Sequence, residues 1–401
     1  MDVARLNFSH QTIDWHRERV AMIRDVSAEA GRPIGILQDL PGPKIRVGNF
    51  PDGPVELKVG QEFTLTAGGA DGDMCGVSVN QKALIEAVEP GDPILLSDGT
   101  IRLRAVHIEN DSVVCEVTVG GRLGSHKGVN LPNRALALPS MTEYDREALI
   151  AGLDMGVDFV ALSFVRSADD VEIARKVIKE HGRHVPIIGK IEKSEALENL
   201  AGIIEAVDAV MVARGDLAVE IPLWDVPQVQ KQVIKAANTA AKPVITATQM
   251  LLSMVDSPQP ARAETSDVAN ALYDGTDAVM LSEETAVGSF PVEAVEVMAN
   301  ICVATEKKLC RPGTYRKLPA DRRHLVPDVV ATAACMVARH LNATALVVPT
   351  RTGSTAIKIG ACRPSQPIIA IGTHIETVGR MTLVWGVVPI YGEDLLTHES
   401  M

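Results

Sequence analysis

Aromatic residues are scarce in this chain, at 3% of 401 residues. Its core must therefore be built from Val, Ala, Ile, Leu and Met, which parallel α/β sheets prefer. Six cysteines are scattered along the sequence without a CxxC pair, and this argues against a disulfide framework or a cysteine metal site. We expect them to be buried structural thiols in a reducing compartment.

Three further absences narrow the class of function. No secretory signal and no long apolar run is visible, which favours a cytoplasmic protein. Positive charge is in deficit, with a formal net charge of −12, which argues against nucleic acid or an anionic membrane as a partner. The sequence contains neither GxxxxGKS nor GxxxxGKT, so a nucleotide cannot be bound by a P-loop.

Four segments each run through a few apolar residues and then stop on polar groups of catalytic type. They are 187–192, 209–216, 244–249 and 278–285, and an amphipathic helical stretch separates each from the next. Segment 158–165 is a further unit of the same kind. The pattern indicates βα units with functional groups at the carboxyl ends of parallel strands. Their spacing fits a (β/α)₈ barrel better than an open sheet.

The length predicts two or three domains. Short alternating runs with Gly, Asp and Pro turns fill residues 47–136, which predicts a small antiparallel β domain, interpreted as a β-barrel lid. It is inserted between two parts of the barrel domain, 1–46 and 137–312. A basic, Pro-containing linker then leads to a small α/β domain at 326–401.

Lys190 and Glu192 are two residues apart on an expected strand, so both point to the same face and can share a site. Taken alone, the pair could equally be a structural ion pair. Asp216 follows Arg214 and Gly215 where a helix opens, so it is either an N-cap or a ligand. Glu192 and Asp216 together offer the hard oxygen ligands with which Mg²⁺ is held when a substrate phosphate supplies the rest.

Cations also gather at the expected strand ends. Arg5, Lys44, Arg46, Lys190 and Arg214 would form a strongly cationic pocket if they converged on one barrel mouth. With a divalent metal, such a pocket suits phosphorylated acids and nucleotides. Stability alone does not require so many charges at that end of a barrel.

Taken together, these segments resemble the pyruvate kinase family along essentially the whole chain. The blocks that carry the resemblance are 1–10 (MDVARLNFSH), 42–46 (GPKIR), 127–132 (KGVNLP), 189–192 (GKIE), 211–217 (MVARGDL), 247–250 (ATQM) and 262–270 (RAETSDVAN). The resemblance implies transfer of the phosphoryl group of phosphoenolpyruvate to ADP, giving pyruvate and ATP in the last step of glycolysis.

The same resemblance implies roles for single residues. Glu192 and Asp216 would hold Mg²⁺ or Mn²⁺, and the amides near Gly215 and Asp216 would receive the substrate carboxylate. Lys190 would stabilise the phosphoryl group in flight, and Arg46 would grip its oxygens. Thr248, through water and Ser282, matches the position implicated in protonating the enolate. Arg5 and Ser163 are also expected around the substrate. The residues expected around the nucleotide are Arg5, Asn7, His10, Arg46 and Lys127.

One departure concerns the monovalent cation. Family members that require K⁺ usually read Asp–Thr–Lys–Gly–Pro–Glu at the second strand end, whereas this chain reads Asp39–Leu40–Pro41–Gly42–Pro43–Lys44. A lysine in place of that glutamate resembles the potassium-independent branch. We therefore expect K⁺ to be dispensable, although Asn7, Ser9, Asp39 and the Leu40 carbonyl could still form the monovalent site.

A second departure lies at the ends. The family has a strand and helix before the position of Met1, that strand being the first of the barrel, and a longer C-terminal domain. Both ends are therefore expected to be truncated. A loop of Thr350, Thr352, Gly353, Ser354 and Thr355 resembles the family's phosphate-binding effector loop, and homotetramers are the family habit. Two rival hypotheses remain: a non-catalytic truncated paralogue, and another Mg²⁺-dependent barrel enzyme that acts on phosphoenolpyruvate.

Overall fold

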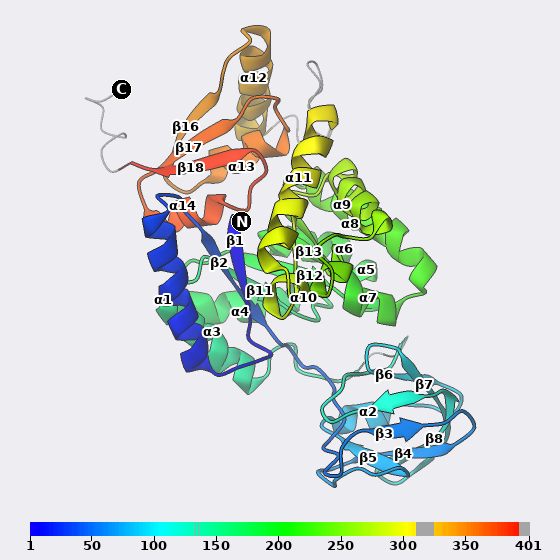
Figure 1. The fold of residues 1–401 in the computed structure, drawn as a ribbon. Coiled ribbons are helices and arrows are strands. Elements are labelled where there is room, and N and C mark those ends of the chain that lie inside the picture. Colours follow the sequence, from blue (N-terminus) through cyan, green and yellow to red (C-terminus); the bar gives the residue numbers. More distant parts are fainter. Residues whose placement is uncertain (133, 135, 310–324, 393–401) are drawn as a thin grey trace.

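The computed structural model describes residues 1–132, 134, 136–309 and 325–392. Its central domain holds seven parallel strands in the order β1-β2-β11-β12-β13-β14-β15, drawn in Figure 1. Their bounds are β1 Val3–Asn7, β2 Gly35–Leu40, β11 Phe159–Leu162, β12 Ile187–Ile191, β13 Ala209–Ala213, β14 Val244–Ala247 and β15 Ala278–Val279. The expected α/β barrel architecture is thus confirmed, with seven strands in the sheet.

Helices connect these strands and cover the outside of the sheet (Figure 1). They are α1 Ile13–Glu29, α3 Glu143–Met155, α4 Ala168–Glu180, α5 Ser194–Glu198, α6 Leu200–Ala206, α7 Arg214–Glu220, α8 Val226–Thr239, α9 Arg262–Asp274, α10 Glu283–Ala286 and α11 Pro291–Leu309, with two short 3₁₀ turns, η1 Leu223–Asp225 and η2 Leu252–Val255. Within the described residues, β1 pairs only with β2 and β15 only with β14, so the curled sheet has two open edges.

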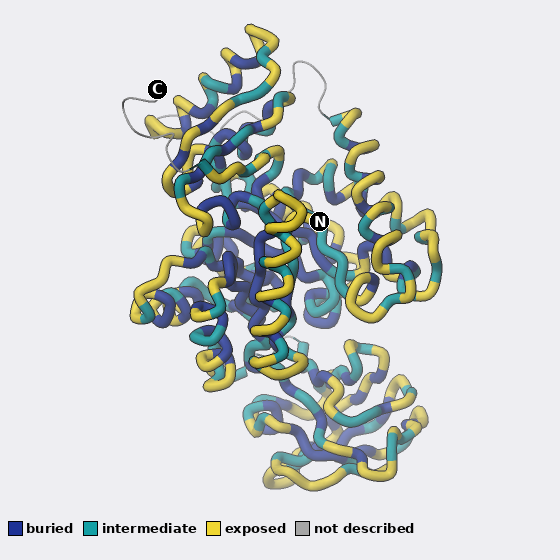
Figure 2. The backbone as a smooth tube through the Cα atoms, turned by 60° about the vertical axis from the view of Figure 1, so that its left-hand side comes forward, coloured by how far each residue is buried: buried dark blue, intermediate teal, exposed yellow. Residues whose placement is uncertain are grey.

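Apolar residues on both faces explain why these strands are buried. All residues of β2, β12, β13 and β14 are buried, as expected for parallel strands covered by helices on one side and by each other on the other. Figure 2 shows these buried segments in the middle of the molecule. Because the strands are parallel, all their carboxyl ends lie at the same edge of the sheet.

A capping box fixes the start of α3, and one of its residues also binds the loop after β2. The hydroxyl of Thr142 accepts from the amide of Asp145, and the Asp145 carboxylate accepts in return from the amide and hydroxyl of Thr142. The second oxygen of Asp145 accepts from the Gly42 amide at 3.0 Å, in the loop after β2. That loop is therefore held in place by a helix about one hundred residues further along the chain.

The lid is built from β3 Val55–Leu57, β4 Glu62–Ala67, β5 Gly76–Val79, α2 Lys82–Ala87, β6 Pro93–Leu96, β7 Ile101–Glu109, β8 Ser112–Val119, β9 Gly121–Leu123 and β10 Val129–Asn130. Its main sheet has the order β10-β6-β7-β8-β4-β5, with β3 and β9 paired separately. The lid is mostly antiparallel, as expected, but β5 pairs with β4 in parallel. Single bridges from Arg46 to Gly128 and from Val47 to Val79 connect the two outer strands of the sheet.

The C-terminal domain contains three parallel strands in the order β16-β17-β18. Its elements are α12 Val326–His340, β16 Leu346–Thr350, α13 Ser354–Ala361, β17 Ile368–Gly372, α14 Ile375–Met381 and β18 Val387–Tyr391. It lies at the end of the barrel opposite the lid (Figure 1). There Leu383 packs into the interior cluster of the barrel, and a Cβ on Gly379 would lie 2.2 Å from Asp158 Oδ1, so α14 is seated closely against the sheet.

Cysteine burial differs from expectation at one position. Cys115, Cys335 and Cys362 are buried as expected, and Cys302 is partly buried, but Cys75 is exposed because it lies in the turn before β5. Cys310 and the linker residues 311–324 lie outside the described residues. None of the helices in the described ranges has the length and apolar composition that a bilayer span requires.

Candidate active site

Lys190 is a buried lysine at the carboxyl end of β12. Its ammonium donates to Ser163 Oγ at 2.7 Å and lies 2.8 Å from Glu192 Oε1 and 3.2 Å from Asp39 Oδ1. The three partners belong to the ends of three neighbouring strands, β2, β11 and β12. Lys190 and Glu192 therefore share a site, as their spacing predicts, and Asp39 and Ser163 lie beside them at the same edge of the sheet.

Opposite charges within this group offset one another. Burial favours the neutral amine of Lys190, but attraction to Asp39 and Glu192 outweighs it and raises the pKa of that lysine, which stays protonated. Burial opposes the charge of Asp39 too, yet Lys190 and then Arg5 hold its pKa below the ordinary value. For Glu192, burial raises the pKa and the nearby Asp216 adds to the effect, despite the opposing attraction of Lys190. A second cation near Glu192 would therefore offset the cost of burying its charge.

The residues expected around a monovalent cation have partners within the protein. Arg5 pairs with Asp39, with Nε at 2.8 Å and Nη2 at 2.6 Å from Oδ2. The Leu40 carbonyl accepts from the Ser163 hydroxyl at 2.7 Å. Asn7 Oδ1 accepts from the Ser9 amide at 3.1 Å. Asp39 is thus already neutralised by two cationic side chains in this arrangement.

Helix α7 begins directly after β13 and carries the Gly215–Asp216 turn. The Gly215 amide donates to Thr248 Oγ1 at 2.8 Å, and the Thr248 hydroxyl donates to the Ala247 carbonyl at 2.6 Å. Thr248 has φ of +69°, in the left-handed region, where its strand ends. The ends of β13 and β14 are therefore joined by the hydroxyl that the sequence singled out, next to the amides expected to receive a carboxylate.

Arg214 does not join the cationic pocket, and that expectation was wrong. Its guanidinium pairs with both oxygens of Asp267 on α9, at 2.7 and 2.9 Å. It also donates to the Ala247 carbonyl at 3.2 Å and to the Thr248 carbonyl at 2.6 Å. Arg214 therefore holds the end of β14 in place through the Ala247 and Thr248 carbonyls, and it does not point into the pocket.

Glu192 and Asp216 form a donor set that fits a divalent metal. Glu192 Oε2 accepts from the Phe164 amide at 2.9 Å, but Oε1 is buried and makes no hydrogen bond, although the Lys190 ammonium lies 2.8 Å away. Asp216 Oδ1 has only the partly exposed Lys44 ammonium at 3.3 Å. No group of three or more metal-ligating side chains occurs in the described ranges, so the protein offers two carboxylates and leaves further positions to a ligand.

An open cleft lies between this site and the lid. Ser9, Pro41, Gly42, Lys44, Arg46, Asn80, Gln81, Thr142 and Tyr144 are among its lining residues. The Arg46 guanidinium donates to the His126 carbonyl at 2.9 Å, which places it beside the exposed Lys127 at the root of the lid. His10 is exposed, and its carbonyl faces the ring of the buried His16 at 2.9 Å. Arg46 and Ser9 thus line one cleft, and Lys127, Asn7 and His10 lie near them along the chain or through the Arg46–His126 contact.

The segment after β15 is shaped by a buried glutamate that the sequence did not distinguish. Glu283 and Glu284 are typical of an acidic helix start, but Glu284 is only 1% exposed. It accepts from the Ser282 amide at 2.7 Å and from the Leu251 amide at 3.0 Å. Glu284 therefore holds Ser282 against the loop after β14. Only its companion, Glu283, is exposed as an acidic first turn would be.

The expected effector loop lies in the C-terminal domain. Thr350 ends β16, and its hydroxyl accepts from the Gly353 amide at 2.9 Å. Gly353 has φ of +83°, which favours glycine, and α13 then begins at Ser354 and Thr355. Thr352 lies in the turn itself. The loop is thus a strand-to-helix turn far along the chain from the barrel mouth.

Comparison with known proteins now bears on this arrangement. The model of the pyruvate kinase barrel domain matches residues 1–295, and that of the pyruvate kinase alpha/beta domain matches residues 328–401. The chain belongs to the pyruvate kinase family. That family consists of transferases that act in glycolysis and use a divalent metal.

Individual relatives agree with this assignment. The chain is similar to pyruvate kinase 2 of Synechocystis, with 46% identity over 98% of this chain and 66% of that protein. It is similar to the pyruvate kinase of Clostridium acetobutylicum, with 43% identity over 98% of this chain and 84% of that protein. The crystal structure of a pyruvate kinase from Cryptosporidium parvum superposes with a TM-score of 0.92 at 37% identity, covering 100% of this chain and 83% of that one.

Proposed function

We propose that this chain transfers the phosphoryl group of phosphoenolpyruvate to ADP, giving pyruvate and ATP. The observation that carries the proposal is Lys190, a buried and protonated ammonium placed between carboxylates at the barrel mouth. Such a cation stabilises negative charge that spreads over a transferring phosphoryl group. Family membership supplies the substrate class.

Cations on both sides of the cleft suit two anionic substrates. Lys190 lies on the barrel side, while Arg46 and Lys127 lie at the root of the lid. We place phosphoenolpyruvate against Lys190, Ser163 and the Gly215–Asp216 turn, and ADP against Arg46, Lys127, Asn7 and His10, with Arg5 between them. Holding the two substrates in line contributes most of the rate enhancement, because little covalent chemistry falls to the protein.

Glu192 and Asp216 would hold the divalent metal, which we take to be Mg²⁺ or Mn²⁺. When bound, this ion would neutralise phosphate and carboxylate oxygens of the substrate. Glu192 Oε1, whose one close partner is the Lys190 ammonium at 2.8 Å, and Asp216 Oδ1, 3.3 Å from Lys44, are the oxygens that would hold it. The pKa of Glu192, which burial raises, favours a second cation at this point.

Proton delivery to the enolate falls to the end of β14. The Thr248 hydroxyl bonds to the Gly215 amide and to the Ala247 carbonyl, so it faces the same turn that would hold the substrate carboxylate. Ser282 is held on the neighbouring loop by Glu284. We propose that Thr248, through water and Ser282, supplies this proton.

Potassium is proposed to be dispensable. Lys44 places a permanent cation 3.3 Å from Asp216, while Asp39 is already paired with Arg5 and Lys190. An ammonium group in that place supplies the positive charge that a monovalent ion would otherwise bring. A cytoplasmic location and a homotetramer follow the family habit, and a phosphorylated effector at the Thr350–Thr355 loop is proposed on the same ground.

The test is pyruvate release from phosphoenolpyruvate, with ADP present or omitted, while Mg²⁺ is titrated and either K⁺ or tetramethylammonium supplies the salt. We expect turnover that needs both ADP and Mg²⁺ and differs less than twofold between the two salts. Turnover without ADP would favour another enzyme acting on phosphoenolpyruvate. A folded protein with no turnover would favour a non-catalytic relative.

A further inference from the structure

Helix α7 contacts the lid at its C-terminal end and, at its start, the segment that leads out to the lid. At the start of α7, Asp216 pairs with Lys44, in the segment between β2 and the lid. At the other end, Glu220 Oε1 accepts from Asn130 Nδ2 at 3.0 Å, on the strand that returns from the lid. Between them, Val219 would lie 3.8 Å from a Cβ built on Gly99 of the lid. The helix that carries the proposed substrate turn is therefore also a docking element for the lid.

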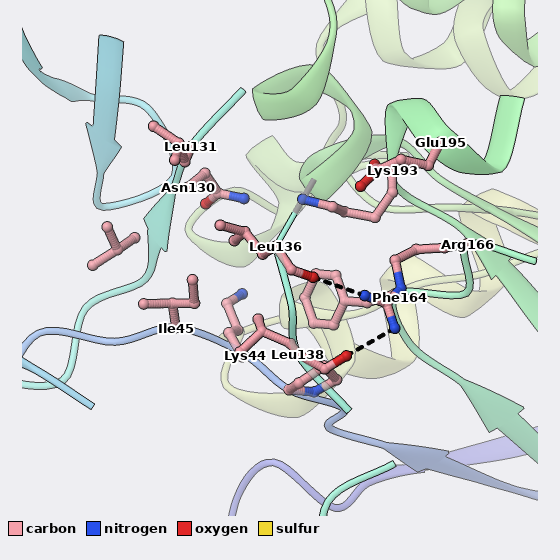
Figure 3. Close-up of a pocket in the computed structure, with 12 residues that line it drawn as sticks. Lys44, Ile45, Asn130, Leu131, Leu136, Leu138, Phe164, Arg166, Lys193 and Glu195 are labelled. Carbon is pink, nitrogen blue, oxygen red and sulfur yellow. Dashed lines mark hydrogen bonds between the residues drawn. The ribbon is translucent and has the colours of Figure 1, made fainter. Parts of the chain in front are cut away.

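Glu220 is the more firmly held of the two contacts. Its side chain is 1% exposed, and Lys193, at 12% exposure, donates to the same oxygen at 2.8 Å. Figure 3 shows the Asn130 amide and the Lys193 ammonium directed toward the same region beside the pocket at the lid root. Asn130 is a neutral donor, so a metal ion bound nearby does not repel it. The Lys44–Asp216 contact, in contrast, lies at a proposed metal ligand and competes with any cation there.

Asn130 is also connected through the backbone to Arg46 and Lys127, the residues proposed to bind the phosphates of ADP. It lies three residues after Lys127 and two after Gly128, which bridges to Arg46. Backbone hydrogen bonds from Val47 to Lys127 and from Val129 to Ile45 join the two strands at the lid root, at 2.9 Å each. Displacement at Asn130 therefore moves Arg46 and Lys127 together.

We propose that the Glu220–Asn130 hydrogen bond is the fixed pivot of the lid, and that Glu220 is a positioning residue that places Arg46 and Lys127 over the phosphates of the nucleoside diphosphate. This inference rests on the proposed function. A metal held at Asp216 would compete with Lys44 for that carboxylate, whereas the Asn130–Glu220 hydrogen bond would remain and keep the lid attached to α7. Coupling through α7 lets the substrate turn and the lid respond to each other.

The experiment compares wild type with Asn130→Ala, with the exchange variant Asn130→Asp/Glu220→Gln, and with Asn238→Ala. The exchange restores the hydrogen bond with donor and acceptor reversed. Asn238→Ala is the matched control, because its amide donates to the Gly275 carbonyl at 3.1 Å, away from the lid. Two readouts are used: steady-state kinetics with each substrate varied, and hydrogen exchange of residues 128–131 without substrates.

For Asn130→Ala we expect a KM for ADP raised about tenfold, the scale of a lost hydrogen bond to a charged acceptor. The kcat falls, the KM for phosphoenolpyruvate stays within twofold, and exchange at 128–131 becomes faster. The exchange variant recovers both readouts, and Asn238→Ala changes neither. Three results would overturn the pivot. They are unaltered kinetics in Asn130→Ala, an equal rise in KM for both substrates, and a folded exchange variant that recovers neither the KM for ADP nor the slow hydrogen exchange. If wild type shows no turnover, the proposed function has failed, and unchanged exchange in Asn130→Ala then refutes the pivot separately.

Discussion

Replacing Lys190 with Met removes a buried ammonium while keeping a side chain of similar length. At an effective dielectric of about 20, the attractions at 2.8 Å to Glu192 and at 3.2 Å to Asp39 amount to roughly 5 to 6 kcal/mol each before desolvation. Arg5 still neutralises Asp39, so Glu192 is the carboxylate left without a cationic partner. Breaking a buried pair in this way costs about 3 to 5 kcal/mol.

The loss of stability depends on pH because Glu192 can be protonated instead. Keeping a carboxyl neutral at pH 7 costs at most about 3.7 kcal/mol, from a reference pKa of about 4.3 at 1.36 kcal/mol for each unit. The same step costs about 1 kcal/mol at pH 5. In the variant, the pKa of Glu192 lies above its unfolded value, so the native state binds a proton that the unfolded state lacks, and stability rises as the pH falls. The deficit relative to wild type therefore shrinks between pH 7 and pH 5.

Urea unfolding at pH 7 and pH 5, with a chelator present, measures this deficit, and pyruvate release measures the loss of function. We expect kcat to fall at least about 10²-fold, the scale of losing one preorganised electrostatic contact to a transition state. Lys176→Met, at an exposed lysine, controls for the change in net charge. A deficit that does not change with pH, or more than a tenth of wild-type kcat retained by Lys190→Met, would refute the reasoning.

Three further predictions test separate parts of the account. Lys44→Glu should make turnover depend on K⁺, measured as the ratio of rates in K⁺ and in tetramethylammonium; an unchanged ratio would reject the role given to Lys44. Gly152→Ala should lower the free energy of unfolding by about 1 to 3 kcal/mol, because its Cβ would lie 2.1 Å from the buried Gln38. Gly202→Ala, with space around the new Cβ, should raise the free energy of unfolding by about 0.5 to 1 kcal/mol. Equal urea midpoints for the two variants would contradict this. Gly379→Ala should loosen the C-terminal domain from the barrel, seen as faster proteolysis of that domain, and unaltered cleavage would show that α14 does not depend on the close approach to Asp158.

Local patterns in the sequence were sufficient for the barrel strands and for the centre of the site. Apolar runs that stop on polar residues locate the strand ends, and the two-residue period places Lys190 and Glu192 on one face. Because parallel strands end at one edge, Ser163 and Asp39 could be expected beside them. The roles in catalysis that the family resemblance suggests for Thr248, Ser282, Arg46 and Lys127 remain predictions.

Contacts between distant segments could not be read from such patterns. Arg214 belongs to a strand end like the other cations, but its partner Asp267 lies 53 residues away and turns it away from the pocket. Glu284 sits in an acidic helix start, and only the folded chain shows that it is buried. Glu220 and Asn130, 90 residues apart, carry no local signal of a shared hydrogen bond. In the lid, the parallel pairing of β5 with β4 depends on the path of the segment between them. The alternation of apolar and polar residues does not determine that path.

The most direct test of the central claim is the stoichiometry of ATP to pyruvate formed from phosphoenolpyruvate and ADP by the 401-residue chain in the presence of Mg²⁺. The account predicts one ATP for each pyruvate, with both products lost in Lys190→Met. Pyruvate formed without ATP, or ATP formation that survives the loss of Lys190, would contradict it.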